Sequence, residues 1–257
     1  MSSFAERLWN ARVTGGTITA GPEDMPDSVE AAFAIQDAVA KAGGLPRGGW
    51  KVGSTSIAMM KKFGATEPAP APMYRQDCLD SPATLKVFAA HNPMVEAEIA
   101  FRLGKDLPAR ATPYTPDEVA AAVDGVAPCF EVVGSRLTTG MLTSGRLLLL
   151  ADNGANIGFV AGKWIADWRG IDLAKVALTM SVNGKQVSDG IGEKAMGNPF
   201  NVMAWIANHL SKRGYGMHKG EVVSSGSLSS QAFVHDGDVA DADFGALGKV
   251  TVTIKAV

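Results

Sequence analysis

The chain has 257 residues, of which 46% are hydrophobic and 19% charged, and its formal net charge at pH 7 is -2. This composition is typical of a globular protein and lies outside the range of disordered chains. The length suits one large domain, or one domain with a small lobe. Lys and Arg form no basic run that could follow a phosphate backbone, so we expect no nucleic-acid partner.

The sequence also argues against secretion and membrane insertion. Cys78 and Cys129 form neither a disulfide framework nor a zinc-binding pattern. Apolar runs such as 147–151 are far too short to span a bilayer, and the charged N-terminal segment does not resemble a signal peptide. We therefore expect a cytoplasmic protein with reduced thiols and no membrane partner.

The first 80 residues predict a small lobe of helices and one strand. Asp27, with Glu30 three residues later, forms the capping-box pattern that begins a helix. Prolines alternate with alanines at 68–72, which predicts a stiff extended loop and a lobe boundary. In chain order the expected elements are helices at 1–12, 27–42 and 57–63, with a strand at 50–54.

From residue 81 onward the sequence predicts mostly strands. Asn183-Gly184 is a hairpin signal, and Pro199 suits the first turn of a helix. Because strands and helices do not alternate regularly, a mixed α+β fold with a large curved sheet is favoured over a doubly wound sheet. The expected elements are strands at 84–88, 95–103, 126–135, 156–160, 176–182, 186–188, 221–224, 232–235, 238–242 and 249–254, and a helix at 199–213.

Two glutamates face the same side of one predicted strand. Residues 95–102 alternate, with apolar side chains on one face and Glu96 and Glu98 on the other. Like charges at this spacing, roughly 6–7 Å along the backbone, repel each other, and burial would raise their pKa values. A cation between them would remove both problems. The alternative is a solvated strand face paired with Arg102.

A third glutamate lies in an apolar run. Glu131 is the only charged residue of 126–133, where an unpaired carboxylate costs several kcal/mol. A salt bridge to Arg136 or Arg146 is the alternative explanation. Three oxygen donors without Cys or His suit Mg²⁺ or Mn²⁺. The pattern therefore predicts one divalent-cation site.

Other residues are candidates for catalysis and substrate binding. Lys51 lies among glycines on a predicted strand, where it suits proton transfer near the cation, or is an ordinary edge-strand lysine. Asp152 and Asn153 open a polar segment that faces the substrate or simply turns. Residues 224–227 could offer backbone N–H groups to a carboxylate, or form a polar turn. The nucleophile-elbow, P-loop and dinucleotide motifs are not matched.

Two segments resemble the 2-keto-4-pentenoate hydratase family of the fumarylacetoacetase superfamily. Val95-Glu96-Ala97-Glu98-Ile99-Ala100-Phe101, followed by Leu103-Gly104-Lys105-Asp106-Leu107, is similar to its metal-binding strand. Pro128-Cys129-Phe130-Glu131-Val132-Val133-Gly134-Ser135-Arg136 is similar to its third-ligand strand. Trp50-Lys51-Val52-Gly53, Asp152-Asn153 and Gly197-Asn198-Pro199 also match, so that the resemblance covers nearly the whole chain.

The resemblance implies a fold and a site. The fold would be a mixed β-roll of the fumarylacetoacetase C-terminal-domain type with peripheral helices, in which a lobe at 1–80 contributes Lys51 to a metal-binding domain at 81–257. Lys51 would be the acid/base, and the chain would form a homo-oligomer, with a decarboxylase or hydratase as a further expected partner. The three glutamates would bind Mg²⁺ or Mn²⁺, and the expected substrate-binding residues are Ser54, Asp152, Asn153, Ser225 and Gly226.

The expected activity is metal-dependent addition of water to a 2-hydroxy-2,4-dienoate or 2-oxo-4-enoate in aromatic-compound catabolism. The alternatives are decarboxylation of a 2-oxo diacid of the 4-oxalocrotonate type, C–C hydrolysis or tautomerisation of an acylpyruvate, and a metal-dependent binding protein or partner subunit without activity. Two departures bear on this choice. Ala69 stands where the hydratases carry an Asp that assists the lysine, and Ala155 and Asn156 replace a Ser-Ser pair.

Overall fold

The computed structural model describes residues 2–62 and 64–257, and it is built on two β-sheets. The larger sheet has the strand order β2-β1-β10-β5-β6-β7-β3, with β11 paired to β5. Its strands are β1 (Arg47–Gly53), β2 (Ala69–Tyr74), β3 (Cys78–Asp80), β5 (Met94–Leu103), β6 (Val123–Val133), β7 (Asn156–Ala161), β10 (Val222–Ser224) and β11 (Ala232–Phe233).

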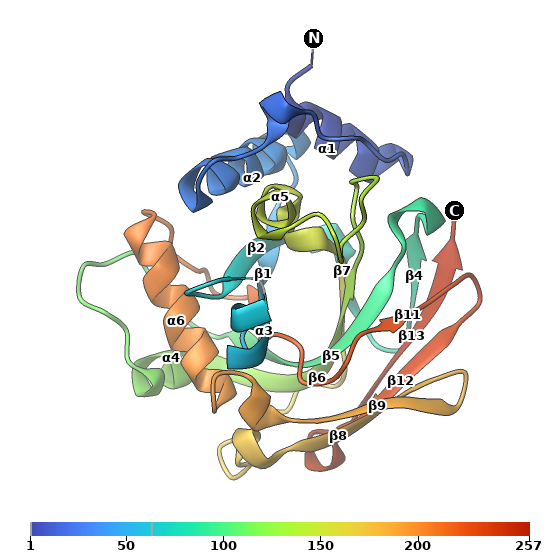
Figure 1. Cartoon of the computed structure of the whole chain (residues 1–257). Coiled ribbons are helices and arrows are strands. Elements are labelled where there is room, and N and C mark those ends of the chain that lie inside the picture. Colours follow the sequence, from blue (N-terminus) through green and yellow to red (C-terminus); the bar gives the residue numbers. More distant parts are fainter. Residues whose placement is uncertain (1, 63) are drawn as a thin grey trace.

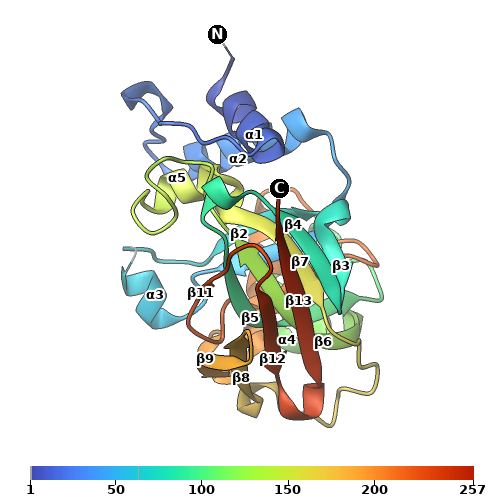
Figure 2. The same ribbon diagram turned by 90° about the vertical axis from the view of Figure 1, so that its right-hand side faces the viewer.

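The smaller sheet has the order β4-β13-β12-β8-β9. Its strands are β4 (Ala83–Val87), β8 (Ala177–Val182), β9 (Lys185–Ile191), β12 (Val239–Asp243) and β13 (Lys249–Ala256). Figure 2 shows β12 and β13 running as a long ribbon beside the larger sheet. The predicted hairpin is present between β8 and β9, where Asn183 and Gly184 both have positive φ, as a two-residue turn of this type requires.

Helices cover the sheets at one end and along one side (Figure 1). Helices α1, α2 and α5 share a small apolar cluster that includes Leu8, Val39 and Leu148, and α4 lies beside α6. The helices are α1 (Phe4–Thr14), α2 (Val29–Gly43), α3 (Ile57–Lys62), α4 (Pro116–Ala122), α5 (Arg146–Ala151) and α6 (Pro199–Lys212). None of the helices in the described part of the chain is long and apolar enough to cross a membrane.

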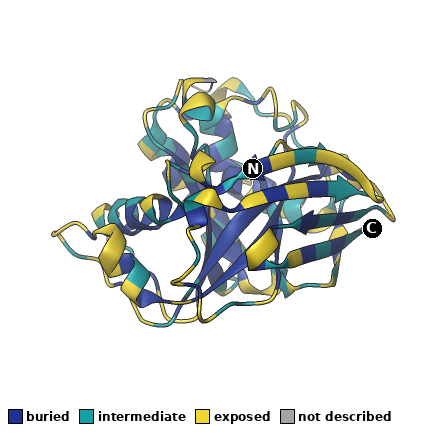
Figure 3. Ribbon diagram, turned by 90° about the horizontal axis from the view of Figure 1, so that it is seen from below, coloured by how far each residue is buried: buried dark blue, intermediate teal, exposed yellow. Residues whose placement is uncertain are grey.

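The alternation predicted for 95–102 holds in β5. Val95, Ala97 and Ile99 point into the main apolar core, which both sheets and α4 and α6 share. The opposite face is also buried, so β5 is enclosed on both sides. Figure 3 shows this contrast: central strands are nearly continuously buried, whereas strands of the smaller sheet alternate between buried and exposed residues. The expectation of a mixed α+β fold is confirmed.

The start of the second helix was predicted one residue too early. Ser28, not Asp27, is the N-cap of α2, because its hydroxyl accepts the N–H of Ala31 at 3.2 Å. Asp27 instead accepts a hydrogen bond from that same hydroxyl at 3.0 Å. The expected end is correct, since Gly44 takes the left-handed conformation as C-cap. The first predicted helix was expected to include residue 1 and the third to reach residue 63, both of which lie outside the described residues.

The alanine–proline segment is a strand, which corrects the prediction of an extended loop. Ala69–Tyr74 forms β2, paired antiparallel to β1. Proline is tolerated there because β2 is an edge strand, and its missing N–H groups leave no bond unmade on the open side. Both β1 and β2 thus belong to the larger sheet, and the division into 1–80 and 81–257 stays a prediction.

Two helices were not predicted. α4 begins with a capping box between Thr115 and Glu118, a local signal that sequence analysis overlooked. α5 is a run of leucines between an arginine and an alanine, and such a run shows no helical period by itself. Its position becomes clear only from the fold, where α5 lies between α2 and the strands β2 and β1 (Figure 1).

Candidate metal centre

The three predicted glutamates come together on neighbouring strands. Glu96 of β5 lies directly opposite Glu131 of β6 in the antiparallel pairing, and Glu98 is two residues further along the same face of β5. One carboxylate oxygen from each lies within 4.8 Å of the others. Glu98 and Glu131 have no exposed surface and Glu96 has 8%. Strand register, not sequence proximity, therefore builds this cluster.

Each glutamate receives a hydrogen bond that fixes its orientation. The Gly226 N–H donates to Oε2 of Glu98 at 2.8 Å, and the Asn156 amide donates to Oε1 of Glu131 at 2.9 Å. Gln231 donates to Oε1 of Glu96. The other oxygens, Glu98 Oε1 and Glu131 Oε2, are buried and have no hydrogen-bond partner among the described residues. Buried acceptors without partners are costly, so these two oxygens call for a ligand.

The surroundings of the cluster oppose ionisation of its carboxyls. Burial raises the pKa of Glu98 well above its usual value, and the neighbouring charges of Glu131 and Glu96 raise it further. Burial also raises the pKa of Glu131 to about 7, although the Lys51 ammonium acts in the opposite direction. The pKa of Glu96 is raised by the same burial. A cation would reverse these shifts by favouring the charged forms.

Arg136 and Arg102, two of the alternative partners considered for these glutamates, are engaged elsewhere, and Arg146 forms no salt bridge with them among the described residues. Arg136 forms a buried salt bridge with Asp152 at 2.6 Å, and Arg102 pairs with Asp124 at 2.7 Å. Within the described residues, the trio's salt bridge is to Lys51, whose Nζ lies 3.8 Å from Glu131 Oε1. Three carboxylates and one ammonium leave two negative charges unbalanced. The donor set and this charge therefore fit one divalent cation.

Lys51 is an interior residue and not an edge-strand lysine. Strand β1 lies between β2 and β10, and the Lys51 side chain is buried. Gly154 makes room for it: a Cβ at that position would lie 2.5 Å from Lys51 Cε and 2.9 Å from Nζ. The 3₁₀ turn Asn153–Ala155 that carries this glycine has positive φ at all three residues. Such backbone strain is typical of functional sites.

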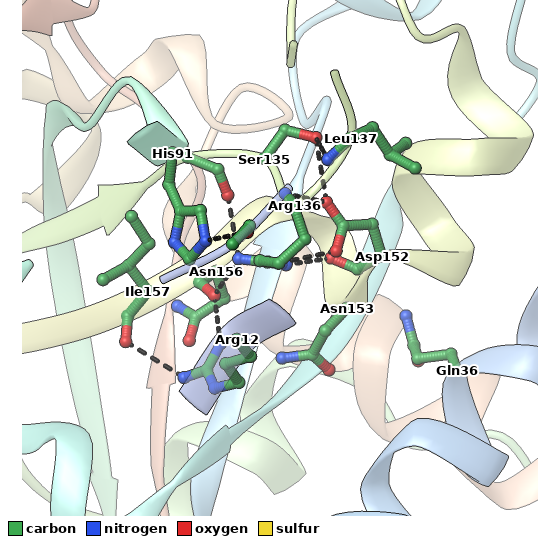
Figure 4. Close-up of polar contacts among 12 residues, drawn as sticks. Arg12, Gln36, His91, Ser135, Arg136, Leu137, Asp152, Asn153, Asn156 and Ile157 are labelled. Atoms are coloured by element: carbon green, nitrogen blue, oxygen red, sulfur yellow. Dashed lines mark hydrogen bonds and ion pairs between the residues drawn. The ribbon is translucent and has the colours of Figure 1, made fainter. Parts of the chain in front are cut away.

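Asp152 and Asn153 were expected to face the substrate, but they do not line the cavity described below. Both oxygens of Asp152 accept hydrogen bonds, from Arg136 Nε at 2.6 Å and from the Arg136 N–H and the Ser135 hydroxyl at 2.9 Å. The Asn153 amide donates to the Pro72 carbonyl at 3.1 Å. Figure 4 shows Arg136 directed at Asp152. These contacts hold the turn that packs against Lys51. Asp152 and Asn153 therefore support the position of Lys51 without lining the cavity themselves.

Ser225 and Gly226 also act as parts of the framework. The Ser225 hydroxyl accepts the N–H of Ile99 at 3.1 Å, which ties this loop to β5. Gly226 lies so close to β1 and to the segment after it that a Cβ would lie 2.7 Å from the Val52 carbonyl oxygen and 2.1 Å from Thr55 Oγ1, and its φ is +85°. The prediction that this loop offers an N–H to a carboxylate holds for Glu98, a carboxylate of the protein itself.

A cavity of about 350 Å³ opens beside the cluster. Lys51, Ser54 and Glu96 line it, so these three predicted residues share one wall. Ala69 and Ala155, the positions at which the sequence departs from the hydratase pattern, line it as well. This volume suits a small ligand. The lining combines polar side chains with apolar ones such as Met141 and Leu149, which suits an acid with a hydrocarbon chain.

Sequence analysis missed Asn156 and Gln231, the two amides that orient Glu131 and Glu96. Asn156 was seen only as a departure from a serine pair at the start of β7. Gln231 precedes the predicted strand at 232–235 and carried no signal. Both contacts join residues far apart in the chain, which explains why no local pattern revealed them.

Comparison with known proteins identifies the family. The model of the fumarylacetoacetate (FAA) hydrolase C-terminal domain matches residues 61–255. The chain therefore belongs to the fumarylacetoacetate hydrolase family, and its fold is of that C-terminal-domain type. The family resemblance expected from the motifs is confirmed.

Within this family, the chain is similar to hydratases and to a decarboxylase. A 2-keto-4-pentenoate hydratase of Paraburkholderia xenovorans (strain LB400) is 32% identical over 250 residues, with 96% of this chain and 91% of that one covered. A 2-hydroxyhexa-2,4-dienoate hydratase of Comamonas testosteroni is 37% identical over 169 residues, with 66% and 62% covered. The 4-oxalocrotonate decarboxylase of Pseudomonas putida G7, complexed with magnesium and adipate, has a TM-score of 0.88 at 26% identity, with 97% and 95% covered.

Proposed function

We propose that the chain is a divalent-metal-dependent lyase that adds water to a 2-hydroxy-2,4-dienoate or its 2-oxo-4-enoate form during breakdown of aromatic compounds. One observation carries the proposal: three buried carboxylates exceed the charge of Lys51 by two and adjoin a cavity lined by that lysine. The hydratase names of relatives that align over most of the chain support the reaction type.

Glu96, Glu98 and Glu131 would hold the cation, and we propose Mg²⁺ or Mn²⁺. A set of carboxylate oxygens without sulfur or nitrogen favours such hard ions. The magnesium in the related decarboxylase supports this choice. When bound, the cation supplies a Lewis acid that stabilises negative charge on the oxygens of a 2-oxo acid.

Lys51 would act as the acid/base. Its Nζ lies at the cavity wall, 3.8 Å from Glu131, and Gly53 and Gly154 leave it space. From there the ammonium can give a proton to a substrate carbon, and the amine can take one back, as the substrate passes between enol and keto forms. Burial of Lys51 and the glutamates keeps solvent from competing for that proton.

The proposal is tested by following loss of the dienol absorbance of 2-hydroxypenta-2,4-dienoate and formation of the hydrated product. We expect turnover with Mg²⁺ and its loss after chelation. Lys51→Met should reduce kcat by about 10²- to 10⁴-fold, the usual range for an acid/base group, while Mn²⁺ binding persists. Undiminished hydration by chelated, metal-free protein would refute the proposal.

Decarboxylation of a 2-oxo diacid is a second candidate, favoured by one observation. The cavity presents Ala69 where the hydratases have the Asp that assists the lysine. Loss of carbon dioxide needs an electron sink but no water addition, so this substitution would matter less. The structural likeness to the 4-oxalocrotonate decarboxylase supports it. Measuring carbon dioxide release beside hydrated product separates the two reactions.

Three further expectations belong to the proposal. We infer a small 2-oxo acid as ligand, assembly of the chain into a homo-oligomer, and a cytoplasmic location. A decarboxylase or hydratase partner is proposed on the same ground, the resemblance to enzymes of this family.

A further inference from the structure

Two cationic side chains of the cavity have no part in the proposed chemistry. Arg146, the first residue of α5, and Lys194, which follows β9, line the same cavity as Lys51 and Glu96. Neither forms a salt bridge with an acidic residue among those the structure describes. A cavity wall with unpaired positive charge attracts an anionic part of a ligand.

Arg146 is held in place by one hydrogen bond, but not all of its hydrogen-bond donors are used. One terminal nitrogen, Nη2, donates to the backbone carbonyl of Glu67 at 3.1 Å. The Glu67 carboxylate does not pair with Arg146 and lies 3.9 Å from His209 Nδ1 instead. The Nε of Arg146 is buried and has no hydrogen-bond partner among the described residues. A guanidinium fixed on one side with a free donor on another suits a planar acceptor such as a carboxylate.

The net charge of the cavity also favours a ligand with two negative charges. With a divalent cation in place, the three glutamates and Lys51 are balanced. Arg146 and Lys194 then remain as two positive charges that no acidic side chain balances within the described residues. A substrate with one carboxylate would leave one of these charges uncompensated, whereas a dianion would balance both. Electrostatic complementarity of this kind selects between ligands.

Part of the cavity lining is apolar. Val133, Met59, Met141 and Leu149 line the same cavity. These side chains suit a hydrocarbon segment that joins two polar ends.

We infer that the substrate is a 2-oxo or 2-hydroxydienoic diacid, and that Arg146, aided by Lys194, binds its second carboxylate. This inference rests on the proposed function, since it assumes that the first carboxylate lies at the metal. Arg146 is thus a specificity-determining residue. It selects the diacid over the acid that carries a methyl group in place of the second carboxylate.

Binding of unreactive analogues tests this inference without turnover. Full-length protein saturated with Mg²⁺ is titrated calorimetrically with 2-oxoadipate and with 2-oxohexanoate, which differ only in the terminal group. The pair 2-oxopimelate and 2-oxoheptanoate repeats the comparison with one more methylene. We expect the diacid of at least one pair to bind about tenfold tighter or more, the effect of one charge-assisted contact worth about 1.4 kcal/mol.

Substitutions test whether Arg146 and Lys194 cause the preference for the diacid. Arg146→Gln should bring the diacid-to-monoacid affinity ratio close to one, Lys194→Gln should lower it partly, and Arg146→Lys should keep part of it. Arg169→Gln, which removes the same charge from an exposed position outside the cavity, should leave the ratio unchanged. Melting temperatures of all variants identify any that fail to fold. If Arg146→Gln does not fold, the affinity ratio of Arg146→Lys is compared with that of the unchanged protein instead.

The outcomes are distinguishable. Equal binding of diacid and monoacid in both pairs overturns the inference but leaves the proposed function standing. A preference for diacid that survives both Arg146→Gln and Lys194→Gln overturns the assignment to these residues. Failure of every 2-oxo acid to bind in the presence of Mg²⁺ overturns the proposed function and this inference with it.

Discussion

Glu98 is the residue whose surroundings define the site most sharply. It has no exposed surface and lies near two other carboxylates. One of its oxygens accepts the Gly226 N–H, while the other has no hydrogen-bond partner in the part of the chain that the structure describes. An uncompensated buried carboxylate costs several kcal/mol. Without a cation the protein can reduce this cost only by keeping a proton on the cluster.

That proton makes the stability of the metal-free protein depend on pH. The pKa of Glu131 is raised to about 7 and that of Glu98 is raised well above its usual value, so the folded state binds more protons than the unfolded state. Stability conferred by these groups is therefore lost as pH rises. In chelator, we expect the melting temperature to fall as the pH rises from about 5 to about 7, the pKa of Glu131 in the folded protein.

Mg²⁺ should reverse this trend, because it binds the deprotonated carboxylates and its stabilisation grows with pH. The buried histidines do not account for the effect: burial lowers the pKa values of His91 and His209, and lowered values make stability rise with pH, not fall. Glu98→Gln removes one of the titrating groups and should flatten the slope measured in chelator. An equal slope in that variant would show that other groups cause it.

Asn156 is expected to position Glu131. Its amide donates to Glu131 Oε1, and Arg12 in turn approaches the Asn156 carbonyl (Figure 4). Removing a hydrogen bond to a metal ligand usually weakens metal binding about 10- to 100-fold. We therefore expect Asn156→Ala to raise the Kd for Mn²⁺ by about that factor, measured by electron paramagnetic resonance.

Asn201→Ala provides the control for that measurement. It deletes an exposed amide that donates to the Met196 carbonyl and, among the described residues, to none of the three glutamates. A folded Asn156→Ala protein with the Mn²⁺ affinity of the control would contradict the positioning role.

For individual residues, the sequence identified charged side chains of the candidate site, but it did not reveal which partners these side chains contact. The alternation around Glu96 and Glu98 and the apolar run around Glu131 follow from local patterns. That Glu131 lies opposite Glu96 follows from the β5–β6 register, which depends on pairing between distant segments. Asp152 was assigned to the substrate because a polar turn does not reveal that Arg136 occupies it.

Among the structural elements, the turn Asn153–Ala155 most directly affects the proposed acid/base, because it packs against Lys51. It links α5 to β7, and its left-handed backbone places Gly154 against the Lys51 side chain. Strain at this position is offset by the buried Arg136–Asp152 pair before it. The turn therefore connects a buried ion pair to the position of the proposed acid/base.

Gly154→Ala tests that connection. Its φ of +58° costs an alanine about 1–2 kcal/mol, and the added Cβ would lie 2.5 Å from Lys51 Cε. We expect lower stability by about that amount and a fall in kcat of about tenfold or more as Lys51 is displaced, measured by urea unfolding and steady-state kinetics.

Gly184→Ala is the matched control, since Gly184 also has a positive φ, +75°, but no described residue lies within 4 Å of a Cβ there. If Gly154→Ala had the kcat of this control, Lys51 would not depend on the turn.

Elements with a regular period were the easiest to predict. The helix stripe at α6 and the alternation of β5 were recognised almost to their ends. β2 was missed because prolines on an edge strand resemble a loop, and α5 because its leucines face neighbours on more than one side. In both cases the tertiary environment decided the structure, and local propensity did not.

At the scale of the whole molecule, the site is assembled from segments distant in sequence. β1 supplies Lys51, β5 and β6 supply the glutamates, and the loop after β10 supplies the Gly226 N–H. The β10 strand joins β1 to β5 and so sets the separation between the lysine and the carboxylates. The fold type followed from family motifs, whereas the presence of Arg146 and Lys194 in the same cavity as Lys51 emerged only from the three-dimensional arrangement.

The most direct test of the central claim is a crystal structure of the protein grown with Mn²⁺, with data collected for the anomalous signal of manganese. We predict one strong peak per chain, bound by oxygens of Glu96, Glu98 and Glu131 at about 2 Å. A map without a peak at that position, in which the three carboxyl groups instead share protons or bind only cationic side chains, would contradict the account.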